Sequence, residues 1–167
     1  MIYHTTYPSP LGQLTLISDG THITGLWLPG QKYIDPSLLC EAASTASLPV
    51  FRQAEQWLDA YFGGEDLPPL PPLAPEGTDF RKAVWEVLGE IPYGEVTTYG
   101  ATAEKLSGQG IYTSPRAVGG AVGHNPIPIL IPCHRVIGAD GTLTGYAAGL
   151  EAKRFLLDME SLYSEET

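Results

Sequence analysis

Cys133 and His134 are neighbours in the chain, and together they could carry out nucleophilic chemistry. A cysteine attacks as its thiolate, and only a few per cent of an unperturbed thiol is ionised near neutral pH. A histidine, acting directly or through water, would raise that fraction. The surrounding residues 127–136 are mostly apolar, so a core cysteine beside an incidental histidine is an equally good interpretation of this stretch alone.

A second candidate segment begins at Ser114-Pro115, which favours the start of a helix with Ser as the cap and Pro as its first residue. The predicted helix over residues 116–123 is rich in glycine and alanine, so its backbone can approach another helix or a nucleic-acid groove closely. Arg116 lies in its first turn, where the helix dipole disfavours a cation. This placement favours a functional role for Arg116, although a surface ion pair would also explain it.

The elements that must position these residues fall into two parts. Residues 1–75 contain β-prone runs around 2–6, 14–17 and 23–28, an Asp19-Gly20 hairpin turn, a helix from Phe51 to Phe62, and a proline-dense link. Residues 76–167 are mostly helical, with one helix capped by Thr98 and a last helix over 150–160. We therefore predict an α+β fold, with a small N-terminal α/β domain over 1–75 and a mainly helical C-terminal domain over 76–167. The two short helices on either side of residues 108–114 predict a winged helix-turn-helix-like motif in the second domain.

The formal net charge of the chain is −10, which is unfavourable for binding nucleic acid. The excess is concentrated in residues 1–77, which carry eight acidic and two basic residues, whereas residues 78–160 carry nine and seven. A locally positive face in the C-terminal part is therefore still possible.

The sequence has no apolar run of membrane-spanning length and no basic segment followed by an apolar one at its start. We expect a cytoplasmic protein without a membrane segment, with Cys40 and Cys133 reduced.

The stretch 131–136, Ile-Pro-Cys-His-Arg-Val, resembles the active-site motif of the O6-alkylguanine-DNA alkyltransferases, also called methylated-DNA–protein-cysteine methyltransferases. Further segments resemble the family in the same order along the chain: 93–100, 116–121, 125–126, 145–146 and 156–160. The resemblance is close over 80–160 and loose over 1–75, and the combined motifs are highly specific.

The resemblance implies a single-turnover repair protein that flips O6-alkylguanine out of double-stranded DNA and moves the alkyl group onto Cys133. His134 would act on the thiol through a water, because neighbouring side chains of an extended segment point apart. Glu160 would orient His134, and the spacing of residues 152, 156 and 160 places this acid on an apolar helix face. Tyr99 would donate to the departing guanine, and Arg116 would fill the vacated place in the base stack.

The remaining expected site residues also follow from the resemblance. Asn125 would organise the active-site turn. The expected DNA contacts besides Arg116 are Ala117, Gly120, Thr98 and Gly100, and the expected base-pocket residues are Tyr146, Ala147 and Val136. We expect a monomer without a cofactor. Some relatives carry a structural zinc, but His4, His22 and Cys40 do not form a ligand cluster of convincing spacing, so we expect no metal.

Two departures from the family pattern are visible. Ala148 stands where many members have glycine, and the interval from Tyr99 to Arg116 is a few residues longer than in the best-known members and lacks a basic residue in 109–112. Two other functions are compatible with parts of the sequence. A lesion-binding module without transfer is disfavoured by the presence of Cys133, and a Cys-His hydrolase leaves Arg116 and the glycine-rich helix unexplained. The sequence leaves open whether O4-alkylthymine is also a substrate.

Overall fold

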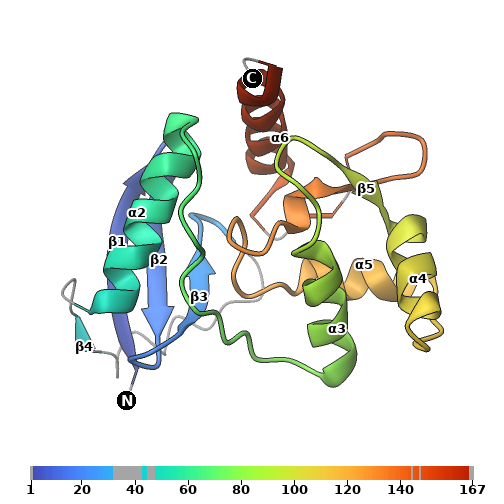
Figure 1. Ribbon diagram of the computed structural model, residues 1–167, viewed down its shortest axis with the longest axis horizontal. Coiled ribbons are helices and arrows are strands. Elements are labelled where there is room, and N and C mark those ends of the chain that lie inside the picture. Colours follow the sequence, from blue (N-terminus) through green and yellow to red (C-terminus); the bar gives the residue numbers. More distant parts are fainter. Residues whose placement is uncertain (1, 32–42, 45–47, 144, 147, 166–167) are drawn as a thin grey trace. The chain divides into compact units, whose positions relative to one another are not determined.

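The computed structural model describes residues 2–31, 43–44, 48–143, 145–146 and 148–165. Contacts within the chain divide it into two units, Met1–Glu76 and Gly77–Thr167, each with its own core (Figure 1). The first unit holds a sheet and one described helix, and the second is mainly helical. The α+β class predicted from the sequence is therefore confirmed.

The sheet of the N-terminal unit has the strand order β3-β2-β1-β4. Strands β1 (Tyr3–Ser9), β2 (Gly12–Ser18) and β3 (Ile23–Trp27) pair antiparallel, and β4 (Ala43–Ser44) pairs parallel with the start of β1. The predicted hairpin turn between β2 and β3 is present, where the Asp19 carboxylate accepts from the backbone N–H groups of Thr21 and His22 at 2.9 and 2.8 Å. Such side-chain bonds are the reason that aspartate favours turns.

Strand β1 covers the β-prone run around residues 2–6 and continues through Pro8, which pairs with Gln13, to Ser9. Proline lacks an N–H donor, so it is tolerated in a strand where its nitrogen faces no neighbouring strand that would accept a hydrogen bond. Among the described residues, β4 pairs with β1 only at Tyr3 and His4, so the proline lies beyond that ladder.

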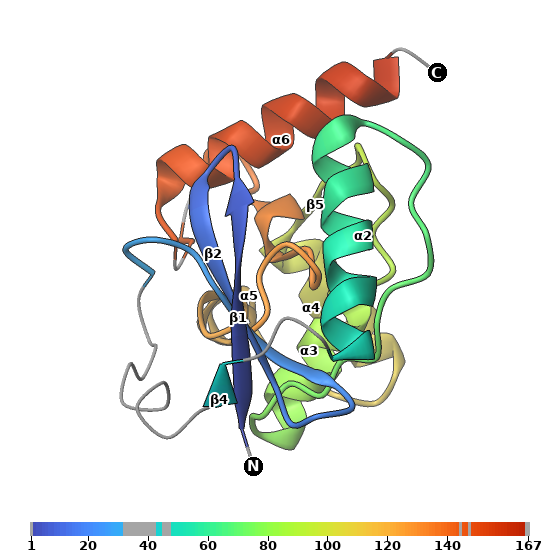
Figure 2. The same cartoon turned by 90° about the vertical axis from the view of Figure 1, so that its left-hand side faces the viewer.

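Helix α2 (Pro49–Gly63) lies against one face of the sheet, as Figure 1 and Figure 2 show from two directions. Of the apolar residues at helical spacing along this helix, Phe51, Ala54 and Leu58 are fully inaccessible and Phe62 is half-buried. Gly64 ends the helix in the left-handed conformation (φ 69°), which glycine adopts without steric cost. Downstream, Leu73 forms a bridge to Ile23, so the proline-dense link packs on the sheet.

The C-terminal unit contains α3 (Asp79–Leu88), α4 (Tyr99–Gly108), α5 (Pro115–Gly123) and α6 (Leu150–Glu165). The short strands β5 (Thr97–Thr98) and β6 (Val136–Ile137) pair parallel, and the 3-10 turn η1 (Cys133–Arg135) directly precedes β6. Helices α3, α4 and α5 pack on one another, and the indole of Trp85 donates to the carbonyl of Ala121 at 2.9 Å. Helices α4 and α5 form the predicted helix-turn-helix. No helix among the described residues is long and apolar enough to cross a membrane.

Both predicted helix caps of this motif are present. The Thr98 hydroxyl accepts from the Ala101 N–H at 3.0 Å, and the Ser114 hydroxyl accepts from the Ala117 N–H at 3.2 Å. Each cap satisfies a backbone donor that the helix itself leaves without an acceptor. Two residues that carry no chemistry themselves thus fix where α4 and α5 begin.

Candidate active site

Cys133 lies at the start of η1, where the apolar run of residues 127–131 turns back on itself. Its N–H donates to the carbonyl of Ile131 at 2.8 Å, and the N–H of Arg135 donates to the carbonyl of Pro132 at 3.1 Å. Cys133 and His134 therefore lie in a 3-10 turn and not in an extended segment. Successive side chains of a 3-10 turn also diverge, at three residues per turn, so a water between thiol and imidazole stays the expected route.

Asn125 holds together the turn that leads to Cys133. Its side-chain amide donates to the carbonyl of Ile131 at 2.9 Å, and its carbonyl oxygen accepts from the N–H of Ile127 at 2.9 Å. Asn125 is almost fully buried. Within the turn, Ile129 adopts a positive φ of 75°, a conformation that costs a β-branched residue on the order of 1–2 kcal/mol. The two side-chain bonds of Asn125 help to hold this strained turn closed.

His134 and Arg135 both bind the Glu160 carboxylate, which α6 supplies from 25 residues further along the chain. His134 Nε2 lies 2.5 Å from Glu160 Oε2. Arg135 binds the same carboxylate twice, Nε to Oε1 at 2.8 Å and Nη2 to Oε2 at 3.1 Å. All three side chains are buried. The Arg135–Glu160 ion pair is therefore desolvated, and His134 binds the same carboxylate.

The loop before β5 completes the surroundings of Glu160. The N–H of Gly94 donates to Glu160 Oε1 at 3.2 Å, and Arg135 Nη1 donates to the carbonyl of Ile91 at 2.7 Å. Gly94 has φ 83°, and a Cβ at this position would approach the Ser164 hydroxyl to 2.7 Å. Glycine is therefore required here both for its conformation and for the close approach of α6.

These contacts set the protonation states of the pair. Burial by itself raises the pKa of Glu160, but the hydrogen bonds from His134 and Arg135, together with the charge of Arg135, outweigh burial and bring the pKa down to about 2. Burial lowers the pKa of His134, and the charges of Arg135 and Lys153 lower it further, against the opposing effect of Glu160. His134 is therefore neutral at neutral pH. Because an ionised Glu160 can only accept, the His134 proton sits on Nε2 and Nδ1 remains basic.

Cys133 is buried, and burial raises the pKa of its thiol to about 11. Interactions with the Asn125 amide, the Lys153 charge and the Tyr146 phenol oppose this effect. Lys153 is itself fully buried, and burial lowers the pKa of its amine to about 8. At neutral pH a mostly protonated Lys153 thus acts on the sulfur as a buried cation, which favours the thiolate.

The other predicted residues divide into buried and exposed groups. Val136 and Tyr146 are both buried. Val136 directly follows the turn η1, and the Tyr146 phenol interacts with Cys133. Tyr99 is half-buried; a Cβ on Gly119 would lie 3.8 Å from its ring, and one on Gly145 would lie 3.8 Å from its hydroxyl. Both distances are ordinary van der Waals contacts, so they place Tyr99 beside α5 and beside Gly145.

The predicted DNA contacts lie mainly on the outside of the helix-turn-helix. Arg116, Ala117 and Gly120 are exposed on α5, whereas Thr98 and Gly100 at the start of α4 are half-buried. Of the predicted site residues, Ala147 lies outside the described residues, as does the second thiol, Cys40.

Two buried residues of the site were not predicted from the sequence. Arg135 stands within the quoted motif, and Lys153 falls three residues before Leu156 and seven before Glu160, on the face of α6 predicted to be buried. That helical spacing was a usable signal for Lys153. For Arg135 no comparable signal exists, because arginine is mostly exposed and only the tertiary partner Glu160 explains its burial.

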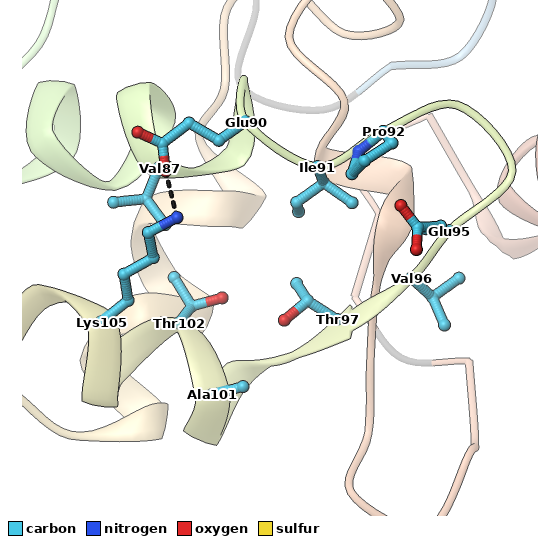
Figure 3. Close-up of a pocket in the computed structure, with 10 residues that line it drawn as sticks. All are labelled: Val87, Glu90, Ile91, Pro92, Glu95, Val96, Thr97, Ala101, Thr102 and Lys105. Carbon is cyan, nitrogen blue, oxygen red and sulfur yellow. Dashed lines mark ion pairs between the residues drawn. The ribbon is translucent and has the colours of Figure 1, made fainter.

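A separate pocket of about 240 Å³ lies between α3, the loop before β5 and α4. Figure 3 shows its lining, with the Glu90–Lys105 ion pair at one end and Val96 and Thr97 at the other. None of the predicted catalytic residues lines this pocket. Within the described part of the chain, no three His, Cys, Asp or Glu side chains are grouped closely enough to hold a metal ion.

Comparisons with known proteins agree with this arrangement. The family described as 6-O-methylguanine DNA methyltransferase, DNA binding domain, matches residues 79–162, and its ribonuclease-like domain matches residues 2–74. The methylated-DNA--protein-cysteine methyltransferase of Haemophilus influenzae is 46% identical over 162 residues, covering 96% of this chain and 87% of that protein. The crystal structure of Mycobacterium tuberculosis O6-methylguanine methyltransferase superposes with a TM-score of 0.85 at 40% identity, covering 98% and 94% of the two chains. The structure of M. tuberculosis OGT in complex with DNA gives a TM-score of 0.83 at 41% identity, covering 96% and 94%. The chain belongs to the 6-O-methylguanine DNA methyltransferase family.

Proposed function

We propose that this protein repairs DNA by transferring the alkyl group of O6-alkylguanine in double-stranded DNA irreversibly onto Cys133. The observation that supports this proposal most strongly is the buried cluster in which a neutral His134, ordered by Glu160, lies in the same turn as Cys133. The family membership supports the same reaction. The buried thiol and the basic Nδ1 are the groups that a displacement at an alkyl carbon needs.

In the proposed step, the proton of the Cys133 thiol passes through one water to His134 Nδ1. The sulfur lone pair then forms a bond to the alkyl carbon while the bond between that carbon and guanine O6 breaks. The electron pair of the broken bond leaves on the guanine, which is a poor leaving group unless its negative charge is stabilised. Tyr99, with its hydroxyl toward the Gly145 region, is the proposed donor to this anion.

The base reaches Cys133 by leaving the DNA stack. A helix with exposed Ala117 and Gly120 is slim enough to enter a widened minor groove, and the capped start of α5 places Arg116 at the entering end. Arg116 would occupy the space that the flipped nucleotide leaves. The structure of M. tuberculosis OGT in complex with DNA supports DNA binding by this chain.

The product is a thioether, which nothing in the cluster can hydrolyse, so each monomer acts once. The test is a titration of a duplex carrying O6-methylguanine against the protein, with the restored guanine measured after digestion of the DNA. We expect one guanine per chain and no more. Binding without restored guanine would instead identify a lesion-binding module, and turnover of an ester or amide beyond one equivalent would identify a hydrolase.

A further inference from the structure

Tyr112 is the most exposed of the large hydrophobic side chains in the described part of the chain. Its side chain is 86% accessible, whereas the next in order, Leu162, is 57% accessible. Single exposed apolar residues are common on protein surfaces, so exposure alone decides nothing. The exposure of Tyr112 is relevant to function because the residue lies in the turn of the helix-turn-helix.

The backbone on both sides of Tyr112 is fixed by hydrogen bonds. At the end of α4, Gly110 adopts φ 88°, and the N–H of Ile111 donates to the carbonyl of Leu106 at 2.9 Å. This is the six-to-one bond that closes a helix whose chain then turns away. At the start of α5, Ser114 accepts from Ala117 with its hydroxyl and from Val118 with its carbonyl, at 3.2 and 3.1 Å. Only Tyr112 and Thr113 lie between these two closures, so the aromatic ring is presented from a constrained turn.

The same turn leads directly into the proposed DNA-binding surface. Tyr112 precedes Arg116 by four residues, and residues 114–117 and 120 of α5 are exposed. Residues 109–115 contain no lysine or arginine, and the whole chain carries a net charge of −10. Attraction between protein cations and phosphates is therefore weak at this place. An aromatic ring supplies contact area to a nucleic acid without needing a charge.

We propose that Tyr112 is a DNA-contacting residue: its ring packs on the deoxyribose and base edges of the strand next to α5, and its phenol donates to a phosphate. This inference rests on the proposed function. It means that the turn contributes to DNA affinity through the Tyr112 side chain and without a positive charge. Tyrosine hydroxyls are among the groups that contact DNA phosphates.

The test is the affinity of Tyr112→Ala for an O6-methylguanine duplex across a series of salt concentrations. A contact at the low end of the contributions that aromatic side chains make to nucleic-acid binding corresponds to about a 5-fold change in Kd. We expect Kd to rise by about this factor at every salt concentration, with an unchanged slope of log Kd against log salt. Loss of a phosphate-binding cation would instead lower the slope by about one. Tyr112→Phe should keep most of the affinity, because it retains the ring and loses only the phenol.

Leu162→Ala is the matched control, since it removes another exposed apolar side chain from the same unit. Nitration of Tyr112 by tetranitromethane, mapped by mass spectrometry with and without duplex, gives an independent readout, and we expect protection by DNA. An unchanged Kd in Tyr112→Ala together with unprotected nitration would overturn the inference. A wild-type protein that neither binds the duplex nor restores guanine would overturn the proposed function itself, so the two failures are distinguishable.

Discussion

Replacement of Glu160 by glutamine removes the charge that holds the catalytic cluster together. In the wild-type protein the pKa of Glu160 falls from its ordinary 4.5 to about 2, because His134 and Arg135 outweigh the effect of burial. Since one pKa unit corresponds to about 1.4 kcal/mol, the ionised form contributes about 3 kcal/mol to stability at neutral pH. Removing one partner of a buried pair typically costs 3–5 kcal/mol, which agrees in size.

The stabilisation that ionised Glu160 contributes depends on pH, and the direction of its pKa shift decides whether it grows or shrinks in acid. A depressed carboxyl pKa means that the unfolded chain binds more protons than the folded one between pH 4.5 and about 2. The stabilising contribution is therefore fully present above pH 4.5 and is lost as the pH falls toward 2. The difference in unfolding free energy between wild type and Glu160→Gln should shrink from about 3 kcal/mol at pH 7 to about 1 kcal/mol at pH 3.

Urea unfolding at pH 7, 5 and 3 measures the difference, and single-turnover transfer from an O6-methylguanine duplex measures the chemistry. Transfer should slow by at least about 100-fold, because an unordered His134 loses its contribution as a general base. The control is Glu90→Gln, which removes an exposed carboxylate ion-paired with Lys105 and should change stability by less than about 1 kcal/mol. A Glu160→Gln protein as stable and as fast as wild type would refute the assignment of Glu160 as the organising group.

Three further variants test separate parts of the account. Lys153→Met should slow alkylation of Cys133 by iodoacetamide at pH 7 about 10-fold and shift its pH–rate profile upward, because the buried cation that favours the thiolate is gone; an unshifted profile would contradict this role. Tyr99→Phe should bind duplex normally but transfer about 100-fold more slowly, and a wild-type transfer rate would remove Tyr99 from the mechanism. Ser114→Ala should lower the unfolding free energy by about 1 kcal/mol in urea, with Ser114→Asp largely restoring it, since the lost contact is an N-cap; equal stability of all three proteins would argue against the cap.

Much of the fold was predictable because it depends on local rules. The hairpin turn at Asp19, the buried face of α2, and the caps at Thr98 and Ser114 all follow from side-chain chemistry within a few residues. Strand β1 continues through Pro8 because the cost of a proline in a strand depends on which neighbouring strand lies beside it. That information is not local, so the sequence pattern around the proline does not contain it.

The candidate site was predictable where it is a linear motif and unpredictable where it is assembled in space. Cys133, His134 and Asn125 are close in sequence, and the burial of Glu160 was predicted from the helical spacing on α6. The bidentate role of Arg135 depends on a carboxylate 25 residues away, and burial of the Lys153 ammonium contradicts the usual preference of lysine for the surface. The type of turn at Cys133, a 3-10 turn, was also not specified by the sequence pattern.

The central claim is that the alkyl group ends on the sulfur of Cys133. The most direct measurement is the mass of the protein after reaction with an O6-methylguanine duplex, followed by peptide mapping of the modified site. The account predicts one methyl group in place of one hydrogen, located on the Cys133 sulfur, and no mass change in Cys133→Ala. A methyl group on any other residue, or an unmodified Cys133 in a reaction that restores guanine, would contradict it.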